Sequence, residues 1–185
     1  MGIANLLTLL RILLVPLFVL IFYLPFRGMH ALAALLFAIA ALTDWLDGYL
    51  ARSLRQVSRL GALLDPVADK LMVVTALILL IGERHLPYLA IPAVIIVCRE
   101  IAVSALREWM AEIGKRARVS VSKLGKIKTA IQMLSIILLL LYQPQQSWIG
   151  LAVSGYLLFY AAALLTLWSM GIYLSVAWQT LRAHS

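Results

Sequence analysis

The stretch TDWLDGYLARSLRQVSRLGALLDPVADK, from Thr43 to Lys70, contains every aspartate of the chain and lies between two long hydrophobic runs. The four aspartates are Asp44, Asp47, Asp65 and Asp69. Runs of this length favour membrane helices, and a carboxylate inside a membrane is costly unless it is paired or binds a cation. This stretch therefore connects the fold of the chain with its chemistry.

The composition indicates an integral membrane protein. Of the 185 residues, 64% are hydrophobic and 13% are charged, whereas soluble domains carry about 25% charged residues. The net charge is +8, but the basic residues collect between the apolar runs and no nucleic-acid-binding motif accompanies them. Anionic lipid headgroups and phosphorylated substrates explain the charge better than a nucleic acid does. The single cysteine, Cys98, excludes a disulfide framework, and we expect it to be a packing residue.

Six apolar runs are long enough to cross the hydrocarbon core as helices, which takes about 20 residues each. Proline, glycine or clustered charges separate the runs, and the last run is longer than one crossing needs. The predicted spans are residues 6–25, 31–50, 62–82, 86–111, 124–142 and 148–178. We therefore expect an all-α integral membrane protein with six transmembrane helices and a single domain over residues 1–185.

The basic residues lie mainly on one side of these spans, and short loops rich in Lys and Arg stay in the cytoplasm. Alternate loops and the chain ends carry most of this charge, at positions such as Arg52, Arg59 and Lys115, whereas the opposite loops carry only Arg27 and Arg84. This asymmetry predicts that both termini and the connection between the aspartate pairs are cytoplasmic. The first run lacks preceding basic residues and a cleavage site, so we expect a retained helix and not a signal peptide.

The spacing of the aspartates places them on two helix faces. Asp44 and Asp47 are three residues apart, and Asp65 and Asp69 are four apart, so each pair shares one face of its helix. The short connection makes the two helices antiparallel, and both pairs then lie just inside one membrane surface. Four carboxylates at this depth repel one another and lose hydration unless cations bind among them. Oxygen ligands favour Mg²⁺ or Mn²⁺, and two such ions support phosphoryl transfer.

Small residues between the aspartate pairs leave room for a second helix or a nucleotide. Gly48, Ala51 and Gly61 allow a close approach, and Arg52 can contact a phosphate or one of the aspartates. Each glycine taken alone is better explained by ordinary helix packing. The four aspartates together are not, because a surface-loop aspartate needs no partner three or four residues away.

Written as spacing, the stretch from Asp44 to Asp69 is D-x2-D-G-x2-A-R-x8-G-x3-D-x3-D, and it resembles the signature of the CDP-alcohol phosphotransferase family at every fixed position. Members of this family join an alcohol to the phosphatidyl or similar group of a CDP-linked donor and release CMP. The resemblance implies that the four aspartates hold two divalent cations, Mg²⁺ or Mn²⁺, and that Asp69 is the general base toward the acceptor hydroxyl. It also implies a homodimer.

Segments outside the signature indicate the acceptor. NLLTLLRILLVP (residues 5–16), the stretch of residues 99–129 and TLWSMGIYL (residues 166–174) resemble bacterial members of the family that use sn-glycerol 3-phosphate. This resemblance implies transfer of the phosphatidyl group from CDP-diacylglycerol to sn-glycerol 3-phosphate, in the bacterial inner membrane and with the active site facing the cytoplasm. An alternative keeps the chemistry and uses inositol phosphate, serine, choline or a phospholipid. A metal-ion or proton-coupled transporter is a remote alternative, because the aspartates occupy only one interface.

The predicted substrate contacts form two sets. A dianionic acceptor phosphate needs basic residues near the metal site, and the connection between the fourth and fifth spans supplies them. We predict acceptor contacts from Arg107, Arg118, Lys123, Lys126 and Lys128, with Arg107 and Lys126 foremost, and CDP-diacylglycerol contacts from Gly48, Ala51, Arg52, Gly61, Asn5 and Thr8. A surface-lying first turn explains Asn5, Thr8 and Arg11 as well. Arg99 and Glu100, deeper in the fourth span, fit a structural pair or a substrate contact.

Overall fold

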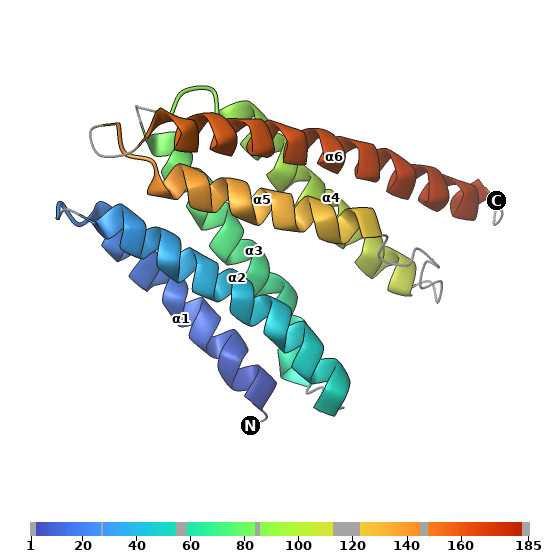
Figure 1. The fold of residues 1–185 in the computed structure, drawn as a ribbon. Helices are drawn as coiled ribbons and strands as arrows, with labels where there is room; N and C mark the ends of the chain where they lie inside the picture. The colour runs from blue at the N-terminus through green and yellow to red at the C-terminus, as the bar shows by residue number, and fades with distance from the viewer. Residues whose placement is uncertain are drawn as a thin grey trace.

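In the computed structural model the described part of the chain is all-helical, with six α-helices and no strand (Figure 1). The structure describes residues 3–26, 28–54, 59–83, 86–112, 123–144 and 148–182; within these, only the backbone is described for residues 3–8, 44–54, 59–66, 69, 107–108, 111–112, 123–124, 126 and 176–182. The helices are α1 (Ile3–Tyr23), α2 (Met29–Leu54), α3 (Arg59–Gly82), α4 (Ala90–Glu112), α5 (Lys123–Leu141) and α6 (Ile149–Arg182). Each predicted span overlaps one of these helices, so the all-helical prediction is confirmed.

Within the described residues, five of the six helices contain an apolar segment. Within the described residues, one helix is long and apolar enough to cross a membrane, over Ile149–Ser175 of α6. Shorter apolar segments cover Leu9–Tyr23, Met29–Thr43, Lys70–Gly82 and Ile127–Leu141. The segments of α2 and α3 adjoin the signature, whose side chains lie outside the described residues. Six spans and cytoplasmic termini therefore stay predictions.

Successive helices alternate in direction along the bundle (Figure 1). One end of the bundle holds the C-terminal ends of α2, α4 and α6 and the N-terminal ends of α1, α3 and α5. We name it the signature end. Helix α1 packs against α2 and α3, α5 packs against α6 and α2, and α4 packs against α6. This arrangement brings the signature and the flanks of the basic connection to one end, as the sequence predicts.

Aromatic rings and one glycine determine how closely the helices pack. Phe18 of α1 and Phe37 of α2 are fully buried, with their ring centroids 6.2 Å apart. Gly155 of α6 faces Leu139 of α5, and a Cβ atom at Gly155 would lie 2.9 Å from the Leu139 side chain. Because real Cβ atoms do not approach that closely, the close contact between α5 and α6 depends on this glycine.

The buried face of α4 includes a charged residue, and hydropathy along the chain does not reveal which face that is. Ile96, Arg99 and Val103 are buried and share one helix face. Cys98 lies on the opposite side of the helix and is exposed. The expectation that Cys98 is a packing residue is therefore wrong, because the face of α4 that carries it has no neighbouring helix among the described residues.

Candidate active site

The four signature aspartates lie on neighbouring helix ends. Asp44 and Asp47 are near the C-terminal end of α2, and Asp65 and Asp69 are near the N-terminal end of α3. Both helices are continuous through these positions and contact each other, so each pair keeps its one-face spacing. The four side chains lie outside the described residues. Among the side chains that are described, no group of three or more His, Cys, Asp or Glu is placed to hold a metal ion.

The chemistry of the aspartate donor set still fits a divalent cation. Four carboxylates supply hard oxygen ligands, and the two helix ends that carry them belong to packed, oppositely directed helices. No cysteine or histidine lies on α2 or α3 between Thr43 and Lys70, so the donor set there contains no soft or nitrogen ligand. The metal site remains a prediction that the backbone arrangement supports.

The other predicted substrate contacts gather near the signature end. Asn5 and Thr8 are on α1, Gly48, Ala51 and Arg52 on α2, Gly61 on α3, Arg107 on α4, and Lys123, Lys126 and Lys128 on α5. Arg118 lies outside the described residues. Lys128 is the one residue of this set whose side chain the structure describes. The helices therefore bring the two predicted sets to the same end of the bundle.

Lys128 belongs to a buried polar network that crosses three helices. Its side chain is 3% exposed, and its Nζ lies 3.4 Å from Oε1 of Glu100. Nη1 of Arg99 donates to the same oxygen at 3.0 Å, and Nη2 of Arg99 donates to Oγ of Ser169 on α6 at 3.2 Å. The guanidinium also lies 5.8 Å from the centroid of the Tyr173 ring. Arg99 and Glu100 thus form the structural pair that the sequence allowed, with Lys128 as a third member.

A cavity of about 150 Å³ opens between α3, α4 and α5 beside this network. Its polar lining comes from Lys70, Glu100, Thr129 and Gln132. Nζ of Lys70 donates to Oγ of Ser104 on α4. Lys70 directly follows Asp69, the predicted general base, in the chain.

Three polar residues of this lining, Lys70, Thr129 and Gln132, were not considered as site residues from the sequence. Lys70 lies one residue beyond the signature, and Thr129 and Gln132 follow Lys128 on α5. A signal for Gln132 was present, because Lys128 and Gln132 are four residues apart on α5 and so share one face. A search for polar periodicity on the fifth span would have found this face.

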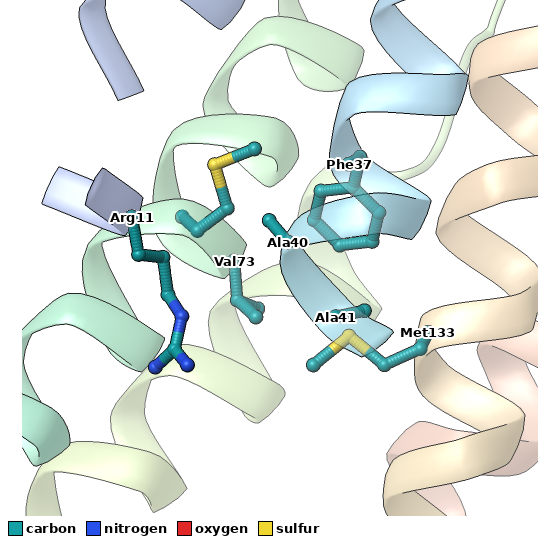
Figure 2. A pocket seen from close by; sticks show the side chains of 7 residues that line it. Arg11, Phe37, Ala40, Ala41, Val73 and Met133 are labelled. Carbon is teal, nitrogen blue, oxygen red and sulfur yellow. The ribbon is translucent and has the colours of Figure 1, made fainter. Parts of the chain in front are cut away.

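Arg11 approaches the bundle from the other side. Its side chain is 2% exposed and lines a small space with Phe37, Ala40, Val73 and Met133 (Figure 2). The guanidinium extends away from α1 into the bundle. The surface-lying alternative is therefore wrong for Arg11, because α1 packs this face against α2 and α3.

Comparison with known proteins identifies the family. Residues 1–168 match the family described as CDP-alcohol phosphatidyltransferase, and the chain belongs to this family. An Escherichia coli K12 protein named CDP-diacylglycerol–glycerol-3-phosphate 3-phosphatidyltransferase is 51% identical over 176 residues, which cover 95% of this chain and 94% of the relative. A relative of the same name from Yersinia enterocolitica is 49% identical over 98% of this chain and 97% of its own length. Another, from Sodalis glossinidius, is 48% identical over 100% of this chain and 99% of its own length. The family resemblance seen in the sequence is confirmed.

Proposed function

We propose that the protein transfers the phosphatidyl group of CDP-diacylglycerol to sn-glycerol 3-phosphate, which gives phosphatidylglycerophosphate and CMP. The observation that carries this proposal is the near full-length similarity to proteins named for this reaction, with 51% identity over 95% of the chain. The intact signature on adjoining helix ends supports the same chemistry.

The signature residues have distinct roles in the proposed reaction. Asp44, Asp47, Asp65 and Asp69 hold two divalent cations, Mg²⁺ or Mn²⁺, which when bound polarise the donor phosphates and neutralise charge on the departing CMP. Asp69 accepts the proton of the acceptor hydroxyl. The acceptor oxygen then forms a bond to the phosphorus of the phosphatidyl group. The bond from that phosphorus to the bridging oxygen breaks, and CMP leaves with this oxygen.

The donor lies against α1, α2 and α3 at the signature end. Gly48, Ala51 and Gly61 leave space for the cytidine diphosphate, since their side chains are absent or small. Arg52 contacts a donor phosphate, and Asn5 and Thr8 line the approach to it from α1. These contacts hold the scissile phosphate beside the carboxylates, which lowers the entropic part of the barrier.

The acceptor occupies the cavity between α3, α4 and α5. Of the described charged residues, Lys70 and Glu100 line this cavity, and Arg99 and Lys128 both contact Glu100. Three cations thus accompany one carboxylate, and this excess of positive charge suits a dianionic phosphate. Further contacts come from the basic residues in and around the connection between α4 and α5, which are Arg107, Arg118, Lys123 and Lys126. The positive cavity disfavours choline, whereas the names of the relatives favour sn-glycerol 3-phosphate over inositol phosphate.

In the same proposal, the protein is a homodimer that crosses the bacterial inner membrane several times and contacts its lipids. Its active site faces the cytoplasm. The excess of Lys and Arg in alternate connections supports this orientation. The apolar segments of α1, α2, α3, α5 and α6 support membrane insertion.

The direct test measures CMP release. Purified protein in detergent is incubated with CDP-diacylglycerol, Mg²⁺ and one alcohol at a time: sn-glycerol 3-phosphate, inositol phosphate, serine or choline. We expect CMP only with sn-glycerol 3-phosphate and none after chelation with EDTA. Release with a different alcohol alone would show that the acceptor assignment is wrong, and full release in EDTA would show that the metal assignment is wrong.

A further inference from the structure

The proposed reaction leaves the buried charge of Arg11 without a role. We infer that Arg11 is a positioning residue, which acts as the internal counter-charge of the signature carboxylates and holds them together when no cation is bound. This inference rests on the proposed function, because it concerns the predicted metal site. It adds a residue of α1 that the signature does not contain.

The surroundings of Arg11 require a counter-charge. Its side chain is 2% exposed, and the described residues that line the space beside it are apolar, with Phe37, Ala40, Met72 and Val73 among them. No other residue of α1 is charged. A guanidinium in such surroundings is strongly destabilising unless a carboxylate compensates for it.

The packing of α1 limits which carboxylates can fill this role. Within the described structure α1 packs against α2 and α3. The acidic residues of those two helices are the four signature aspartates. Helix α5, whose Met133 lines the same space, contains no acidic residue, and Glu100 of α4 already pairs with Arg99 and Lys128. The compensating charge therefore comes from the signature.

The depth of Arg11 agrees with this assignment. At a rise of about 1.5 Å per residue, Arg11 lies about 12 Å from the start of α1, while Asp44 and Asp69 lie about 15 Å from the signature-end termini of α2 and α3. Ala40 and Val73 line the space around Arg11, and each is four residues from an aspartate, Asp44 or Asp69. Those aspartates therefore share the faces that Arg11 approaches, one turn nearer the signature end.

This arrangement predicts a dependence on metal that ordinary packing does not produce. Without a bound cation, Arg11 offsets part of the repulsion among four carboxylates. Once cations bind, they provide that compensation themselves. Loss of Arg11 should therefore destabilise the metal-free protein much more than the metal-loaded protein.

The test compares Arg11→Gln with wild-type protein by thermal unfolding in detergent, once in EDTA and once in Mg²⁺. We expect the rise in Tm on adding Mg²⁺ to be larger in Arg11→Gln than in wild-type protein by about 5 °C or more. The matched control is Arg99→Gln, which also removes a buried guanidinium. Its Tm should fall equally in both conditions, because its carboxylate partner is Glu100.

Several outcomes would overturn the inference. An equal fall of Tm for Arg11→Gln in EDTA and in Mg²⁺ would show a packing role. A raised KM for CDP-diacylglycerol with an unchanged Mg²⁺ response would show a donor contact. In both cases the proposed function would stand. Wild-type protein that releases CMP without any Mg²⁺ response would overturn the proposed metal site and the role of Arg11 with it.

A second variant covers the case in which Arg11→Gln does not yield folded protein. The double variant Arg11→Gln/Asp69→Asn removes one negative charge together with the positive charge. We expect it to be recovered as folded protein, measured by size-exclusion chromatography in detergent. Failure of the double variant to fold any better than Arg11→Gln would overturn the inference.

Discussion

At Glu100, one carboxylate oxygen serves two buried cations. Oε1 accepts from Nη1 of Arg99 at 3.0 Å and lies 3.4 Å from Nζ of Lys128. The two cations are nearly inaccessible to water, whereas the side chain of Glu100 is 33% exposed toward the cavity. Removal of this carboxylate would leave two like charges buried together, which is the costly way to break such a network.

Glu100→Gln should lower the free energy of unfolding by about 2 kcal/mol, which is less than for a fully buried pair because Glu100 is partly solvated. The double variant Glu100→Gln/Lys128→Met should regain part of this loss, since one uncompensated cation is gone. Denaturant unfolding of the single and double variants in detergent measures both values. A double variant less stable than Glu100→Gln would contradict the pairing.

Asp69→Asn should reduce CMP release at saturating Mg²⁺ by about 100-fold or more, because a general base contributes at least this factor. Binding of CDP-diacylglycerol should stay measurable by a thermal shift. The matched control is Glu83→Gln, which removes a carboxylate just beyond the other end of α3 and should leave the rate unchanged. Near-normal turnover in Asp69→Asn would exclude Asp69 as the base.

At the scale of the helices, the contact between α5 and α6 depends on Gly155, which has a hydropathy near zero and so does not stand out in the sequence. The Leu139 side chain is 1% exposed and fills the space in front of Gly155. A second glycine of the same helix, Gly171, has no atom within 4 Å of the position of a Cβ. The two positions therefore give opposite responses to the same substitution.

Gly155→Ala should lower the free energy of unfolding by about 1–3 kcal/mol, because the new methyl group overpacks a filled core. Gly171→Ala should raise it by about 0.5–1 kcal/mol, because alanine loses less backbone entropy in a helix and meets nothing. Both values come from denaturant unfolding in detergent. Equal effects of the two substitutions would show that Leu139 yields to the methyl group.

The sequence predicted where the helices lie in the chain better than it predicted which face of each helix is buried. Apolar runs locate all six helices, but α2 continues to Leu54, beyond the predicted end at residue 50, because backbone hydrogen bonds extend a helix through polar residues. Hydropathy along the chain does not say which side of a helix meets a neighbour. The burial of Arg11 and the exposure of Cys98 therefore could not be predicted.

One part of the candidate site could be predicted from the sequence and another could not. The signature could be predicted because all its residues lie on two helices joined by a short connection. The cavity between α3, α4 and α5 brings together Lys70, Glu100 and Gln132, which are far apart in the chain. Only the packing of the helices joins them into one cavity, so Lys70 could not be predicted, whereas Gln132 could have been found from its spacing to Lys128.

At the scale of the whole molecule, alternate helix directions place the start of α1 and the end of α6 toward the signature end (Figure 1). The proposed orientation puts that end in the cytoplasm. Residues on the opposite end, such as Phe26 between α1 and α2, then face the periplasm. Phe26 is 64% exposed and so is open to a reagent.

This orientation predicts thiol accessibility in a Cys98→Ser background. In right-side-out membrane vesicles, a membrane-impermeant maleimide should label Phe26→Cys directly, and should label Ser53→Cys only after the vesicles are opened. The two positions lie at opposite ends of α2 and serve as controls for each other. The reverse pattern of labelling would show that the chain inserts the other way round.

Helix α6 is 34 residues long, about 51 Å at the helical rise, and exceeds a hydrocarbon core of about 30 Å. Its apolar segment includes Ile149–Ser175, and the helix continues to Arg182. A rigid soluble domain joined to α6 as one unbroken helix would therefore stand clear of a detergent micelle. Each residue added at the junction turns that domain by about 100°, so its direction can be chosen. For a chain of 185 residues, this offers a fiducial for aligning particles in electron cryomicroscopy.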